Sequence, residues 1–97
     1  MTLIAILDLQ LDPQRLDAAR EVLTETLVAT RAFPGSLALE VLTDVSDPAH
    51  VVVYEAWASP EADTAYRAWR AGEGASQLGT VLTRPPILTR FTTESDG

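Results

Sequence analysis

The chain has 97 residues, enough for one domain, and 46% of them are hydrophobic while 22% are charged. Fourteen acidic residues against seven basic ones, all of them arginine, give a net charge of −7, which disfavours nucleic acid and anionic membranes as partners. Cysteine is absent, so disulfides, thiolate nucleophiles and cysteine-bound metals are excluded.

The first predicted elements are a strand and a helix. Over residues 2–11 apolar side chains alternate, and both faces are apolar in the first half, which is typical of a central strand. Asp12 and Pro13 suit the cap and first position of a helix, and residues 33–35 (Phe-Pro-Gly) end it. The inward stripe of this helix comprises Leu16, Ala19, Leu23, Leu27 and Thr30.

A hairpin is predicted next. Residues 36–45 alternate as a second strand, and residues 46–49 have the composition of a turn. The third strand, 50–57, contains three consecutive valines and is the most β-prone part of the chain. The short link between the two strands predicts antiparallel pairing.

The last third of the chain predicts a helix, a break and a strand. Ser59 and Pro60 repeat the helix-start pattern, and the glycines of 72–74 end the helix. Residues 75–82 are expected to add one or two helical turns before a final strand at 87–93. The inward face of the second helix is predicted to comprise Ala62, Ala65, Tyr66 and Trp69.

This order of elements predicts an α+β, ferredoxin-like βαββαβ fold over residues 1–97, with a frayed tail at 94–97. Its four-stranded antiparallel sheet carries both helices on one face. The other face is apolar whether it presents the set that includes Val53 or the set that includes Tyr54. Because a bare apolar sheet face is a liability in water, we expect a homodimer.

Several segments resemble the antibiotic biosynthesis monooxygenase family: residues 32–42, the Asp47-Pro48 pair, residues 53–57 and the helix start at 59–61. The resemblance covers nearly the whole chain and implies a dimeric α+β barrel. Members with demonstrated chemistry oxidise aromatic polyketide anthrones to quinones with O₂. Since they use neither metal nor flavin, the resemblance implies no cofactor and no metal.

The resemblance also suggests where a site would lie. Trp57 stands where the family has a strand-end Trp near the pocket, and Tyr66 stands where many relatives carry His. Val53 and Asp63 replace the Asn and Tyr of the quinone-forming members. The haem-degrading branch depends on an Asn that this chain lacks.

Two candidate catalytic residues follow. Glu55 shares a strand face with Trp57 and could act as a base, although an exposed or arginine-paired carboxylate is the commoner case. Tyr66 could orient a ketone or phenol of the substrate from the second helix. Trp57 could stack on a planar ring or simply pack in the core.

The remaining candidates are weaker. Trp69 lies one helical turn from Tyr66, as a pocket wall or as part of a plain apolar stripe. Arg90 could hold an anionic oxygen or pair with Glu40 or Glu55. Residues that the pattern assigns to the surface are the solvated loop residue His50 and the helix-covering Arg67 and Arg70.

Three functions stay open. The first is a cofactor-independent monooxygenase acting on a small hydrophobic aromatic, anthrone-like ligand with O₂. The second is an isomerase or cyclase, and the third is a dimeric binding protein without catalysis. No signal-peptide pattern is visible and no apolar run approaches the roughly 18–20 residues that span a bilayer, so we expect a cytoplasmic location and no membrane partner.

Overall fold

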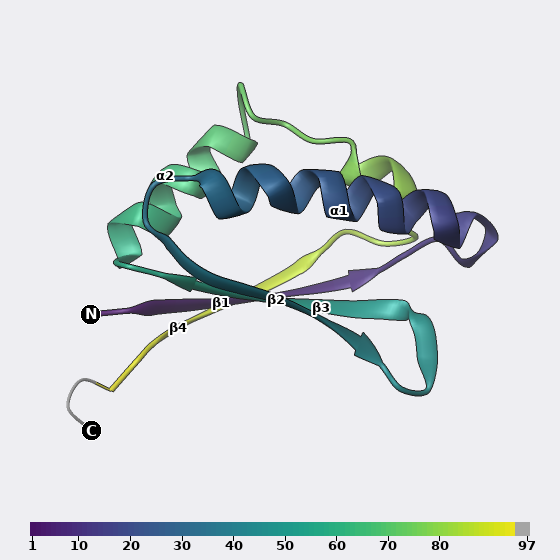
Figure 1. Ribbon diagram of the computed structural model, residues 1–97, viewed down its shortest axis with the longest axis horizontal. Helices are drawn as coiled ribbons and strands as arrows, with labels where there is room; N and C mark the ends of the chain where they lie inside the picture. Colours follow the sequence, from purple (N-terminus) through teal and green to yellow (C-terminus); the bar gives the residue numbers. More distant parts are fainter. Residues whose placement is uncertain (95–97) are drawn as a thin grey trace.

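A computed structural model describes residues 1–94 of the chain. Its four strands form one antiparallel sheet in the order β2-β3-β1-β4, and Figure 1 shows both long helices on the same side of it. The predicted ferredoxin-like α+β fold is confirmed. Of the predicted frayed tail, residues 95–97 lie outside the described residues. The elements are β1 (Leu3–Gln10), η1 (Pro13–Arg15), α1 (Leu16–Ala32), β2 (Ser36–Asp44), β3 (Asp47–Trp57), α2 (Pro60–Arg70), η2 (Leu78–Val81) and β4 (Ile87–Thr92).

Both helix starts use the predicted caps. The Asp12 carboxylate accepts the Gln14 N–H at 2.9 Å, but the turn it caps is the short 3₁₀ helix η1, and α1 begins three residues later. The Ser59 hydroxyl accepts the Ala62 N–H at 3.1 Å and starts α2 directly. Hydrogen bonding by these side chains satisfies donors that the first helical turn leaves free.

The core lies between the helices and the sheet in two clusters. The larger one packs the α1 stripe against β1 and β3, so the inward face predicted for this helix is confirmed. The smaller one groups aromatic side chains around Trp57. Ala65 is exposed, so its predicted inward position is wrong, because the turn of α2 points Asp63 and Tyr66 inward instead.

The hairpin differs from its prediction at the turn. Only Val45 and Ser46 form it, and β3 already begins at Asp47, so the turn predicted at 46–49 is wrong. The Asp44 carboxylate accepts a hydrogen bond from the Ser46 N–H at 2.9 Å, which helps the chain to reverse direction within two residues. A bulge at Leu37 leaves that side chain 60% exposed.

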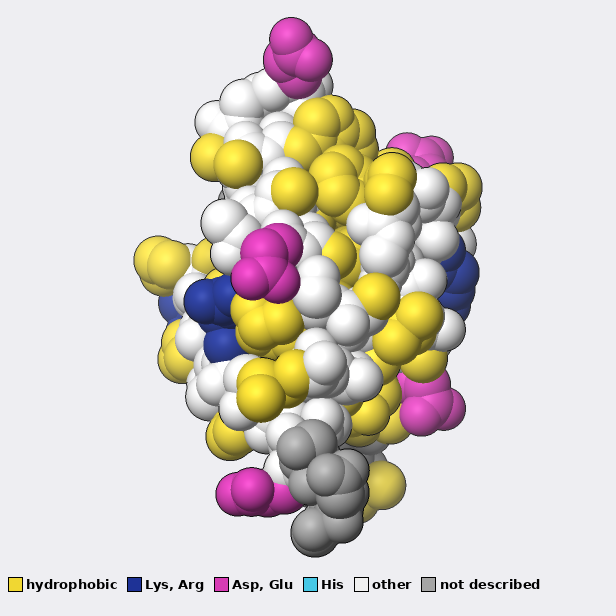
Figure 2. All heavy atoms as spheres, turned by 90° about the vertical axis from the view of Figure 1, so that its left-hand side faces the viewer, with side chains coloured by type: hydrophobic (Ala, Val, Ile, Leu, Met, Phe, Trp, Pro, Cys, Tyr) yellow, Lys and Arg dark blue, Asp and Glu magenta, His cyan; other side chains and the backbone are white. Residues whose placement is uncertain are grey.

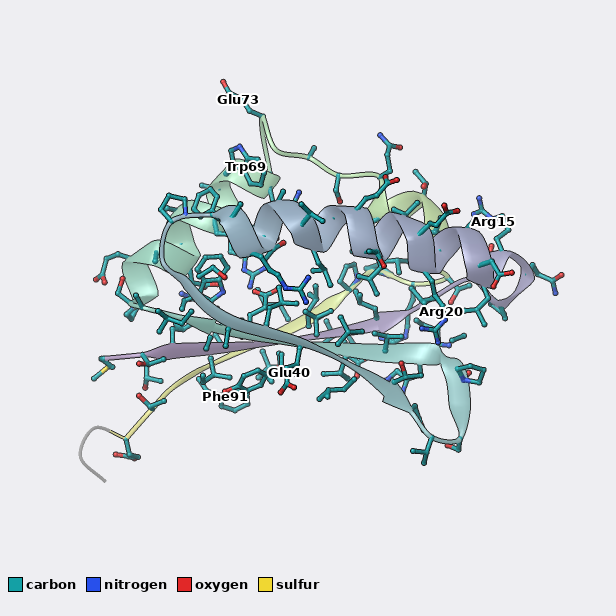
Figure 3. The ribbon with its side chains drawn as sticks, in the orientation of Figure 1. Arg15, Arg20, Glu40, Trp69, Glu73 and Phe91 are labelled. Atoms are coloured by element: carbon teal, nitrogen blue, oxygen red, sulfur yellow. The ribbon has the colours of Figure 1, made fainter. Side chains whose placement is uncertain are left out.

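The sheet face away from the helices is uncovered within residues 1–94. Val51, Val53, Glu55 and Trp57 point towards the helices and are buried, so the alternate set, which includes Tyr54, occupies the other face. In Figure 3 the labelled Phe91 and Glu40 lie on this side of the sheet, whereas Trp69 lies on the opposite side, with the helices. We call this surface the open face. The strand register places these apolar side chains on it: Ile4, Ile6, Leu42, Val52, Tyr54, Ala56, Ile87 and Phe91.

None of the helices described over residues 1–94 is both long enough and apolar enough to cross a lipid bilayer.

Candidate functional site

A cavity of about 280 Å³ lies between the helical layer and the sheet. Its size is near the lower limit for small-molecule pockets, and its walls combine apolar side chains with polar and charged ones. Apolar walls include Leu7, Leu23, Leu27, Leu78, Leu82 and Pro86. Polar side chains in the lining are Thr26, Glu55, Tyr66, Arg67, Arg70 and Ser76.

Glu55 brings a carboxylate into this cavity from β3. Glu55 is only 2% exposed to solvent. One oxygen, Oε1, accepts hydrogen bonds from the Trp57 Nε1–H at 3.0 Å and from Arg67 Nη2 at 2.6 Å. Both contacts fall on the same oxygen, so Oε2 is the one that can face a ligand.

Arg67 and Asp63 continue this ion network behind the cavity wall. Asp63 is fully buried, and its two oxygens accept from Arg67 Nε at 3.1 Å and from Arg90 Nε at 2.6 Å. The prediction that Arg90 pairs with Glu40 or Glu55 is therefore wrong. Arg67 does not cover the helix surface as predicted, because its guanidinium turns inward to two carboxylates.

Tyr66 and Arg70 build a second polar group from the next turn of α2. Arg70 Nε donates to the Tyr66 hydroxyl at 2.8 Å, and that hydroxyl lies 2.6 Å from Thr30 Oγ1 on α1. Arg70 Nη2 also donates to Thr30 Oγ1 and to the Thr26 carbonyl, at 3.0 and 2.6 Å. The surface position predicted for Arg70 is wrong, since its guanidinium joins the two helices over the cavity.

Among the predicted site residues, only Glu55 and Tyr66 line this cavity. Trp57 is fully buried one layer away, with its ring centroid 4.8 Å from that of Tyr66. It reaches the cavity indirectly, through its hydrogen bond to Glu55. Val53 and Trp69 belong to the two core clusters.

Sequence reasoning missed the roles of Thr26, Arg67 and Arg70. One signal was available: Asp63 and Arg67, and likewise Tyr66 and Arg70, are four residues apart and so share a helix face. Their partners on α1 and β3 come from distant parts of the chain. Helical periodicity alone could not have identified those partners.

His50 forms a separate cluster at the rim of the open face. The prediction of a solvated loop residue is wrong, because His50 lies in β3 with Nδ1 2.8 Å from Asp44 and Nε2 3.1 Å from Asp8. Arg84 Nη2 donates to Asp8 at 2.8 Å. Despite this cluster, residues 1–94 contain no group of three or more His, Asp or Glu side chains suited to a metal ion.

The proximity of these groups shifts their titration. Hydrogen bonds to Asp44 and then Asp8 raise the pKa of His50 above its usual value. The hydrogen bond from His50, followed by those from Ser46, lowers the pKa of Asp44 to about 2. Burial alone would raise the pKa of Asp8, but His50 and Arg84 outweigh it and lower that pKa.

Comparison with protein families gives one match: the model described as antibiotic biosynthesis monooxygenase matches residues 2–77. This range holds every element from β1 to α2 and hence all the polar groups of the cavity. A search of curated proteins returned no significant match.

Solved structures share the fold at low sequence identity. A variant of SnoaB, a cofactor-independent oxygenase from Streptomyces nogalater, superposes with a TM-score of 0.81 at 15% identity, covering 97% of this chain and 94% of that chain. A conserved protein from Methanosarcina mazei gives 0.81 at 14%, covering 97% and 94%. The protein Rv0793 from Mycobacterium tuberculosis gives 0.76 at 22%, covering 99% and 98%.

Proposed function

The chain belongs to the antibiotic biosynthesis monooxygenase family, and from this we propose that it oxidises a hydrophobic aromatic substrate with O₂ in the cavity between helices and sheet. The observation that carries the proposal is the buried carboxylate of Glu55, which lines the cavity together with leucine side chains and Arg67. A substrate that enters such a cavity loses its water, and every charge around it acts more strongly.

The proposed chemistry begins with a proton transfer. Glu55 Oε2 removes a proton from an activated C–H of the substrate, such as the methylene of an anthrone. The negative charge moves to the conjugated carbonyl oxygen. Within residues 1–94, Arg67 Nη1 makes no hydrogen bond, so it can donate to that oxygen.

The substrate carbanion then supplies the electrons that reduce O₂. One oxygen atom becomes the new carbonyl of the quinone. The other leaves as water together with the two methylene hydrogens, so the atoms balance without a further reductant. The protein contributes desolvation, orientation and the base, and in this scheme none of its groups donates electrons to O₂.

A homodimer is part of the proposal. No helix of residues 1–94 covers the apolar open face, and Phe91, Leu42 and Ile87 on it are each at least half exposed. A second copy that packs its own open face here would remove this surface from water by two-fold symmetry. Helices and cavities would then lie on the outer sides of the paired sheets.

A non-catalytic binding protein is the second candidate, and one contact favours it. The Glu55 carboxylate already pairs with Arg67 at 2.6 Å, and its Oε1 also accepts from Trp57, so the carboxylate is engaged with the protein's own donors. Binding would need only the apolar walls and the hydrogen-bond donors.

Oxygen uptake with a panel of anthrones separates the two candidates. We expect uptake that falls about 100-fold or more in Glu55→Gln, because a general base contributes that much. Glu61→Gln, at an exposed position at the start of α2, is the matched control and should keep full activity. Ligand binding by calorimetry without any oxygen uptake would instead support the binding protein.

A further inference from the structure

Within residues 1–94, Arg70 differs from the other arginines near the cavity in having no carboxylate partner. Its guanidinium donates to neutral oxygens only: the Tyr66 and Thr30 hydroxyls and the carbonyls of Thr26 and Gly74. Arg67 and Arg90, by contrast, each contact a carboxylate. No carboxylate in the described part of the chain therefore compensates the positive charge of Arg70 in the cavity lining.

Its surroundings make this charge significant. Arg70 is partly buried, and its guanidinium carbon lies 4.8 Å from the Trp69 ring centroid and 5.2 Å from that of Tyr66. Aromatic faces attract a cation, but they do not neutralise it. A partly buried charge without a counter-ion is costly, so an anion beside it is favoured.

The local charge count leads to the same conclusion. The inward ion network holds two carboxylates, Glu55 and Asp63, and two guanidiniums, Arg67 and Arg90. These charges balance, and Arg70 adds one positive charge. The cavity wall is thus locally cationic in a chain whose net charge is −7.

We propose that the cavity binds a compact aromatic ligand through an oxyanion, such as a carboxylate, placed beside Arg70. This inference rests on the proposed function, because it takes the cavity as the substrate site. The apolar walls would hold the ring system, and the guanidinium would hold the charged end. A volume of about 280 Å³ suits a compact fused-ring system.

Two probes of nearly equal shape test the charge preference in the unmodified protein. Calorimetry should show 2-naphthoate binding about tenfold or more tightly than the neutral 2-naphthamide, because a hydrogen bond to a charged group is the stronger one. Equal affinity of the two probes, or no binding of naphthoate at millimolar concentration, would overturn the inference.

Variants then place the anion at Arg70. Arg70→Met should lose the preference for naphthoate, and Arg70→Lys should keep part of it. Arg31→Met, at an exposed position outside the cavity lining, is the matched control and should bind as the parent does. A folded Arg70→Met protein that still prefers naphthoate would contradict the placement. If that variant does not fold, NMR of the parent protein gives the same test: the Arg70 Nε–H resonance should shift when naphthoate is added and not when naphthamide is added. A resonance that naphthoate does not shift would also contradict the placement of the anion at Arg70.

The two proposals fail in different ways. Binding of naphthoate through Arg70 without oxygen uptake on any anthrone would leave the anion site and remove the oxygenase. Oxidation of neutral anthrones that naphthoate does not inhibit would leave the oxygenase and overturn the anion site.

Discussion

Some charged side chains of this protein point inward although their hydropathy predicts exposure, because their long aliphatic stems can be buried. Arg67 and Arg70 can bury their stems while their guanidiniums reach inward to oxygens on other elements. Nominally they are the most polar residues of α2, yet they shape the cavity more than Trp69, which packs in the core. A helical wheel assigns such residues to the surface because it scores the whole side chain as polar.

His50 is a second case at this scale, and its charge should make stability depend on pH. Its pKa is raised in the fold, so its contribution is complete below the ordinary value of 6.5 and is lost as pH rises through the folded value. For Asp44 the pKa is lowered, so its contribution is present above the ordinary 3.8 and is lost as pH falls towards about 2. The cluster therefore stabilises most between these two ordinary values.

We predict that the thermal unfolding midpoint falls when the pH is raised from about 6 to about 9, as the imidazolium loses its proton. In His50→Gln this fall should disappear. Calorimetry at several pH values measures both proteins, and an imidazole NMR titration reports the pKa directly because His50 is the only histidine. The same slope in both proteins would contradict the assignment.

At the scale of elements, α2 is the part that joins sheet, cavity and core. Its inner face carries a buried carboxylate, Asp63, where an apolar side chain would be expected. This carboxylate holds Arg67 and Arg90, and Arg67 in turn holds Glu55. Through these ion pairs, the charged groups of the helix and of the sheet neutralise one another. The pairing with Arg67 also orients the Glu55 side chain.

Asp63→Asn should destabilise the protein by about 3 kcal/mol, the lower end for a broken buried ion pair, because both arginines are partly exposed. Urea unfolding measures this loss. Glu61→Gln, in the same helical turn but exposed, should change stability by less than about 0.5 kcal/mol. Similar effects of the two substitutions would show that the network contributes nothing specific.

For the whole molecule, the main feature is the unequal cover of the two sheet faces. Helices cover one face and leave only side chains of its edge strands exposed, such as Val41 at 39% and Leu88 at 38%. The open face is largely apolar, with the His50 cluster at its rim. Figure 2, the view from the end of the molecule where β1 begins, shows hydrophobic side chains exposed over the helical layer as well as the sheet. Only the sheet, however, offers a continuous, register-aligned apolar surface.

Phe91→Arg should convert the proposed dimer to a monomer, because it places a charge inside a desolvated two-fold interface. Val28→Arg is the matched control: Val28 is 63% exposed on α1, away from the open face, and its replacement should leave the dimer intact. Sedimentation at micromolar concentration measures both. A parent protein that sediments as a monomer would refute the dimer.

Local patterns in the sequence determined the order of elements, the caps at Asp12 and Ser59 and the buried stripe of α1, since each depends on neighbours within a few residues. They also suggested six site residues, and only Glu55 and Tyr66 among them line the cavity; the other four are Val53, Trp57, Trp69 and Arg90. The resemblance to the family came from the same local segments.

Only the tertiary structure decided which face of β3 is covered and where the arginines point. Both faces of that strand are apolar, so alternation could not choose between them. Two of the partners of Arg70, Thr26 and Thr30, lie 44 and 40 residues away in sequence. Such contacts arise from the packing of α1 on α2, and no local pattern encodes them.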